Sequence, residues 1–234
     1  MIIAAALCPA PPALARELTG ADPVLPELRQ ACQDAVAALV RADPELIAVA
    51  GAAEQTRAWD EALKLDLSGY APGLVPPVAA GAPVLPLPLG LGARLLDQAG
   101  YAGRRMLWSV SDDEPPGRCA ELGAQIARSA GKVALIAMAD GSASRGPKAP
   151  GYLDDRSFPF DAEVTRAVRD GDLDALLAVD PDLARELMAT GRPCWQVLAG
   201  SLPGTRPVTE VRYCDDPFGV AYLVASLVVD VARA

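Results

Sequence analysis

Short apolar runs alternate along this chain with longer stretches of helical periodicity, and this alternation most narrows the folds open to it. The runs lack the polar alternation of a half-exposed strand, as expected of strands buried on both faces of a sheet. They comprise residues 2–7 (IIAAAL), 46–50 (LIAVA), 106–110 (MLWSV) and 132–138 (KVALIAM). Helices are predicted between them, over 26–42, 89–99 and 115–130. This order favours a single three-layer α/β/α domain over residues 1–234, with a mostly parallel or mixed central sheet.

The second half of the chain is predicted to be mainly helical. Its periodicity indicates helices over 161–170, 173–179, 181–190, 194–200 and 220–234, with one further strand over 207–213. Asp216 precedes Pro217, a pair typical of a helix N-cap and first helical position, so we expect it to begin the last helix. The stretch 67–92, rich in Pro and Gly, is interpreted as an ordered crossover loop that covers the domain.

The 234 residues include no histidine. This excludes Ser-His-Asp and Cys-His catalysis and any imidazole metal site. A formal net charge of −9 argues against nucleic acid or an anionic membrane as a partner. The opening apolar run is too short for a signal peptide or a membrane span, and the five cysteines form no CxxC pair. We therefore expect a cytoplasmic protein with reduced thiols.

Polar and reactive residues follow four of the predicted strands, at the sheet edge where open α/β folds bind ligands. The segments 8–12, 51–54, 140–145 and 214–216 are expected to meet in one crevice. Its chemistry-bearing candidates are Cys8, Glu54, Asp140, Ser142, Ser144, Cys214 and Asp215. Structural roles remain open for the same residues: turn formation at Asp140, helix capping beside Asp215, and burial of the cysteines as small apolar side chains.

The stretch from Asp140 to Leu202 resembles the class III extradiol ring-cleavage dioxygenases, the LigB catalytic B subunit and Memo superfamily. The resemblance is carried by DGSASRGPKAPGYLDDRSFPFD, by "GD" before the next helix and by the Cys-Trp and Ser-Leu pairs of CWQVLAGSL. RYCDDPFGVAYLVASL likewise resembles the closing "SYEGPFGVGY" segment of that family, and ALCPAPPALARELTG resembles its "PHPP" strand end. With ELIAVAG as the second strand, the resemblance covers nearly the whole chain and implies a LigB-like domain.

The family holds non-haem Fe(II) with two histidines and one carboxylate and uses a further histidine as acid/base. By position, its opening histidine falls on Ala10, the histidine after the second strand on or next to Ala53, and the "GDLSH" histidine on Ser144. The C-terminal glutamate falls on Asp215, beside Cys214. Alanine cannot ligate iron, so the resemblance implies a retained fold whose extradiol chemistry is lost.

Three functions are compatible with the replacement of the family's histidines. The first, which we favour, is a LigB-like homologue that does not cleave rings, needs no cofactor, and keeps its crevice for a small molecule or a partner. The second is a metalloenzyme or oxidoreductase with a rebuilt site, in which Asp140, Ser144 and Asp215 are the catalytic candidates and Cys8, Cys214 and Asp215 the ligands of iron or zinc. The third is a structural or assembly subunit that makes contact through 74–91. We expect a homo-oligomer, most simply a dimer.

Overall fold

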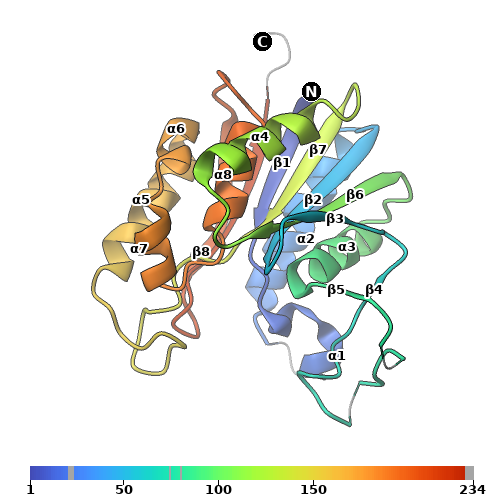
Figure 1. Ribbon diagram of the computed structural model, residues 1–234, viewed down its shortest axis with the longest axis vertical. Coiled ribbons are helices and arrows are strands. Elements are labelled where there is room, and N and C mark those ends of the chain that lie inside the picture. Colours follow the sequence, from blue (N-terminus) through green and yellow to red (C-terminus); the bar gives the residue numbers. More distant parts are fainter. Residues whose placement is uncertain (21–23, 74, 80, 230–234) are drawn as a thin grey trace.

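The structure is a computed structural model that describes the chain except for residues 21–23, 74, 80 and 230–234. A seven-stranded sheet runs through its centre in the order β3-β6-β2-β7-β1-β9-β8 (Figure 1). Its strands are β1 (Ile2–Cys8), β2 (Leu46–Ala53), β3 (Arg57–Trp59), β6 (Arg104–Ser111), β7 (Val133–Met138), β8 (Val208–Asp215) and β9 (Tyr222–Val228). Strands β6, β2, β7 and β1 are parallel, β3 and β9 pair antiparallel with β6 and β1 at the two sides, and β8 pairs antiparallel with β9. The predicted α/β class with a mixed central sheet is confirmed.

Helices cover both faces of this sheet, which gives the fold three layers (Figure 1). One face carries η1 (Pro12–Leu14), α1 (Arg16–Thr19), α2 (Pro26–Arg41) and α3 (Leu87–Gln98). The other face carries α4 (Pro116–Ala127), α5 (Ser157–Asp170), α6 (Leu173–Leu177), α7 (Pro181–Glu186) and α8 (Arg192–Gly200). Each layer therefore buries its own apolar cluster against the same strands.

Strand β1 shows why the central strands contain no polar alternation. Successive side chains of a strand point to opposite faces of the sheet. Ala5 and Leu7 belong to the cluster under α4–α8, whereas Ala4, Ala6 and Cys8 belong to the cluster under α2 and α3. Because both faces are dry, every position of the strand has to be apolar, and the run of small residues follows directly.

The predicted helix over 220–234 is wrong. Residues 222–228 form β9, which lies between β1 and β8, and residues 230–234 fall outside the described part of the chain. The run YLVASL is short, apolar and buried on both faces, and periodicity alone cannot separate such a strand from a buried helix. Consequently Asp216 caps no helix. It begins a turn that joins β8 to β9, in which the Gly219 N–H donates to the Asp216 carbonyl oxygen.

The stretch 67–92 is ordered and packs on the domain, as the sequence analysis predicts for its described residues. Leu67 and Leu85 are buried in the cluster under α2 and α3. Strands β4 (Lys64–Leu65) and β5 (Val84–Leu85) form a small parallel ladder beside it, and α3 begins at Leu87 rather than at 89. Residues 74 and 80 lie outside the described residues. Within the part that is described, no helix is long and apolar enough to cross a membrane.

Helices α4 and α8 cross at very short range because each contributes a glycine to the contact. A Cβ atom on Gly123 would lie 2.1 Å from the carbonyl oxygen of Val197, and one on Gly200 would lie 2.3 Å from the Cα of Ala120. These are backbone atoms of packed helices, so they cannot move aside cheaply. The close crossing fixes α8, whose first residues lie beside the end of β7.

We predict that Gly123→Ala lowers the free energy of unfolding by about 2 kcal/mol, since the added methyl overpacks a backbone contact. Gly117→Ala in the same helix is the matched control, because a Cβ at Gly117 meets nothing within 4 Å. The control should be neutral or slightly stabilising. Urea unfolding of the three proteins measures both effects, and equal stabilities for the two variants would contradict the packing argument.

Candidate functional site

The carboxyl end of β7 is joined to the end of β1 through a carboxylate. Asp140 follows β7, and its Oδ1 accepts a hydrogen bond from the Ala10 backbone N–H at 2.8 Å. The Asp140 carbonyl oxygen accepts from the N–H of Gly191, which immediately precedes α8. Asp140 thus ties two central strands to the start of α8. The predicted meeting of segments 8–12 and 140–145 is present in the structure.

Burial alters the acid–base properties of this position. It raises the pKa of Asp140 to about 6, because the charged carboxylate loses solvent, and the hydrogen bond from Ala10 offsets only part of that effect. Burial also raises the pKa of Tyr222, and the nearby Asp140 carboxylate raises it further. Asp140 therefore changes protonation close to neutral pH, while the Tyr222 phenol remains neutral.

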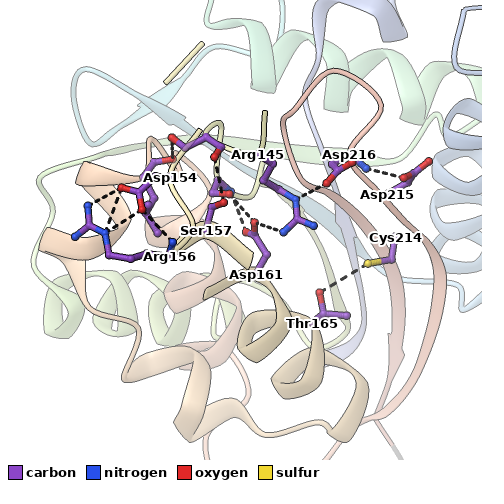
Figure 2. A network of polar contacts seen from close by, with 12 residues as sticks. Arg145, Asp154, Arg156, Ser157, Asp161, Thr165, Cys214, Asp215 and Asp216 are labelled. Carbon is purple, nitrogen blue, oxygen red and sulfur yellow. Dashed lines mark hydrogen bonds and ion pairs between the residues drawn. The ribbon is translucent and has the colours of Figure 1, made fainter. Parts of the chain in front are cut away.

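A second polar network connects the β7–α5 loop to α5 and to the β8–β9 turn (Figure 2). The Ser142 N–H donates to Asp161 Oδ1 at 2.9 Å, and the Ser142 hydroxyl donates to Asp161 Oδ2 at 2.5 Å. Arg145 forms ion pairs with Asp161 at 3.2 Å and with Asp216 at 2.5 Å. Its guanidinium also lies 4.5 Å from the ring centroid of Phe158.

The environment of Asp161 explains why this network matters for the loop. Burial raises the pKa of Asp161, whereas hydrogen bonds from Ser142 and the charge of Arg145 oppose the rise. A buried carboxylate left without these partners would be costly. The chain between β7 and α5 is consequently held at Ser142 and Arg145, and one arginine fixes both the loop and the β8–β9 turn.

A cavity of about 390 Å³ lies between α5 and the β8–β9 hairpin. Arg145, Asp161 and Asp216 line it, together with Thr165 and Arg169 of α5 and Cys214 of β8. The Cys214 thiol is 3.9 Å from the Thr165 hydroxyl (Figure 2). Trp195 of α8 also lines the cavity, with Phe158, Val164 and Leu223 as apolar wall. A space of this size and mixed character is typical of a small-molecule site.

The predicted site residues divide between this cavity, the sheet edge and the core. Asp215 and exposed Cys214 line the cavity, and Asp140 lies at the sheet edge next to Ala10. Cys8 is fully buried under α2, where its neighbour is Cys32, so it is a core residue. Ser142 and Ser144 are buried too: Ser142 holds Asp161, and the Ser144 hydroxyl donates to the Leu187 carbonyl oxygen at 3.3 Å.

Segment 51–54 ends at the same edge of the sheet. Ala53 pairs with Ser111 on β6, two residues beyond the level at which Gly51 pairs with Met138 of β7. Glu54 is exposed and does not line the cavity. Segments 140–145 and 214–216 both line the cavity between α5 and the β8–β9 hairpin, whereas no residue of 8–12 or 51–54 lines it.

These residues do not suit an iron centre of the kind that the family resemblance implies. Ala10 and Ala53 carry no donor atoms, and the Ser144 hydroxyl is directed to a carbonyl oxygen. Over residues 1–20, 24–73, 75–79 and 81–229, no three or more Cys, Asp or Glu side chains are grouped closely enough to hold a metal ion. Two histidines and a carboxylate on one face are what non-haem Fe(II) requires.

Several cavity residues were not identified from the sequence. Asp161, Thr165 and Arg169 were assigned only to a helix, and Trp195 to another. Asp161, Thr165 and Arg169 are four residues apart, which places them on the same side of α5. This spacing was a usable signal, whereas nothing in the sequence showed that α5 would face β8.

Comparison with models of known protein families finds no match, and no curated protein matches the sequence. A solved structure with a similar fold is that of an uncharacterised protein from Escherichia coli K12. The two chains are 14% identical, with a TM-score of 0.57, and the similarity covers 97% of this chain and 99% of the other. At this identity the likeness establishes a shared fold.

We predict that Asp140→Asn stabilises the protein at pH 8 by about 2 kcal/mol. The pKa of Asp140 in the folded protein is raised from 3.8 to about 6, so between these values the native state binds more protons than the unfolded chain, and stability falls as pH rises. The amide retains an oxygen for the Ala10 N–H and carries no charge. At pH 4 the variant and the wild type should be nearly equal.

Urea unfolding at pH 4 and pH 8 measures this difference. Asp34→Asn on exposed α2 surface is the control and should show no comparable pH-dependent gain. A variant less stable than the wild type at pH 8 would show that the ionised carboxylate is needed at position 140.

Proposed function

We propose that this chain is a LigB-like homologue that does not cleave aromatic rings and that binds a small molecule in the cavity between α5 and the β8–β9 hairpin. The observation that carries the proposal is the cavity itself, about 390 Å³ lined by Arg, Asp, Thr and Cys side chains over an apolar wall. It lies at the carboxyl edge of the sheet, where open α/β folds place ligands.

The walls of the cavity are anchored before any ligand arrives. Arg145 is shared between Asp161 on α5 and Asp216 on the β8–β9 turn, so the two sides of the cavity are connected by one guanidinium. Arg145 is only 19% exposed, and partly buried ion pairs of this kind hold their geometry better than surface pairs. A preformed site loses less entropy on binding than one that must be ordered by its ligand.

The absence of ring cleavage is supported by the chemistry of the expected ligand positions. Extradiol cleavage needs a metal to which both the catechol and dioxygen bind. Ala10 and Ala53 supply no donor, and Ser144 is buried against Leu187. Loss of several inner ligands removes both affinity and geometry.

The two other functions have less support from the described residues. A rebuilt metal site would need Cys8 to approach Cys214 and Asp215, but Cys8 is enclosed in the core, whereas Cys214 and Asp215 line the cavity. An assembly contact through 74–91 would need apolar side chains to be free, whereas Leu85 and Leu87 pack against the cluster of α2 and α3. A dimer and a cytoplasmic location stay predictions, and light scattering tests the first.

We predict that small molecules which raise the melting temperature of the wild type lose that effect in Ala162→Trp. Ala162 lines the cavity from α5, so an indole at this position would occupy the ligand space. Glu163→Trp adds the same side chain at an exposed neighbour that does not line the cavity, and it should respond like the wild type. A thermal-shift screen of a fragment library makes the comparison. Compounds that stabilise all three proteins equally would count against the cavity as the binding site.

We predict no ring-cleavage product when the protein is incubated aerobically with ferrous iron and catechol substrates. The reason is the missing donor set, so protein purified without chelator should also contain no stoichiometric iron or zinc. Absorbance of the ring-opened product and elemental analysis measure the two quantities. Stoichiometric metal that disappears in Asp215→Ala and Cys8→Ala would establish the rebuilt metalloenzyme instead.

A further inference from the structure

Several acceptor groups of the cavity already take part in hydrogen bonds within the protein. Both oxygens of Asp161 accept hydrogen bonds from Ser142, and one also accepts from Arg145. Asp216 accepts from Arg145, and Asp215 Oδ1 accepts the N–H of Asp216. Of the three carboxylates that line the cavity, two share one arginine. Arg145 therefore offsets one of these three negative charges, and Arg169 is the other cation that lines the cavity.

The groups that stay available are mostly donors. Arg169 lines the cavity from α5 and, among the residues that the structure describes, forms no ion pair. Within the described part of the chain, the Thr165 hydroxyl has one long contact, with the Cys214 thiol at 3.9 Å. Arg145 uses its Nε and Nη1 atoms for Asp216 and Asp161, which leaves Nη2.

The Trp195 indole N–H is a further hydrogen-bond donor without a partner among the described residues. The Trp195 side chain lines the cavity and is 2% exposed, and its Nε1 has no hydrogen-bond partner in the described part of the protein. A buried indole N–H without an acceptor destabilises the folded state, so native proteins rarely leave one unsatisfied. A ligand with an acceptor atom beside the Trp195 indole would supply the missing partner.

The remainder of the wall is apolar. Phe158, Val164, Ala162 and Leu223 contribute carbon surface to the cavity. We infer that the cavity binds a small organic carboxylate with an apolar body, whose carboxylate meets Arg169 and Thr165 and whose remaining acceptor capacity satisfies Trp195. The inference rests on the proposed function, because it names the ligand class of the same cavity.

Three probes of one carbon skeleton test the inference: 3-phenylpropanoate, 3-phenylpropanamide and 3-phenylpropylamine. They differ in head group alone, so calorimetric titration isolates the contribution of the negative charge. The acid should bind, and the amide and amine should bind at least about tenfold more weakly, since charge-assisted hydrogen bonds to arginine are the stronger ones. The indole N–H resonance of Trp195 should shift on addition of the acid, whereas that of Trp59, which donates to Ser109, should not.

Two variants assign the binding to this cavity. Arg169→Gln should weaken binding of the acid at least about tenfold, and Thr165→Val should weaken it to a smaller degree. Arg166→Gln is the matched control on α5, because Arg166 does not line the cavity and pairs with Asp170 and Asp172. Arg169 is exposed, so its replacement leaves the fold intact.

The contrary results are equally definite. If the amide or amine binds as tightly as the acid, or if Arg169→Gln binds the acid normally, the ligand is not recognised as a carboxylate, although the cavity remains a small-molecule site. If none of the three probes binds, the inference also fails. The proposed function is then judged separately, by the Ala162→Trp screen and by the ring-cleavage and metal assays.

Discussion

Burial of the central strands on both faces is the constraint on which the other features depend. β1, β2 and β7 lie between two helical layers, so neither face of these strands can carry a polar side chain without a partner. Chemistry can therefore begin only where a strand ends. Asp140 lies two residues after the end of β7, and its carboxylate accepts a hydrogen bond from the Ala10 N–H. Polar side chains are therefore placed at the edge of the sheet, because apolar side chains bury both of its faces.

Arg145 connects the two sides of the cavity that lies beside this edge. Without it, Asp161 on α5 and Asp216 on the β8–β9 turn would be separate carboxylates on facing elements, and their charges would repel each other. The Arg145 guanidinium binds both carboxylates, so it holds the β7–α5 loop, α5 and the β8–β9 turn together. The same pairing engages two of the three carboxylates of the cavity, Asp161 and Asp216. Under the proposed function, Arg169, Thr165 and Trp195 are the residues that recognise the ligand.

The lack of histidine has a local meaning within this fold. At the positions where the resemblance to the extradiol dioxygenases would require histidine, Ala10 contributes its backbone N–H to Asp140, and Ser144 holds the α7–α8 connection through Leu187. These positions now serve the fold. A buried carboxyl with a pKa of about 6 and an open cavity lined by Arg, Asp, Thr and Cys side chains lie near these positions.

The α/β class and the mixed central sheet were predicted from the sequence alone, because short apolar runs that alternate with amphipathic helices are typical of strands buried on both faces. The run at 222–228 shows the limit of that reasoning. Like β1 it is short, largely apolar and buried, but it forms an antiparallel strand instead of the expected helix, since local periodicity does not say which neighbour buries it. That strand brings β8 beside α5, and only then do Cys214, Thr165 and Trp195, from three distant segments, line one space. Contacts between such segments depend on how elements pack, so the tertiary structure alone decided the cavity.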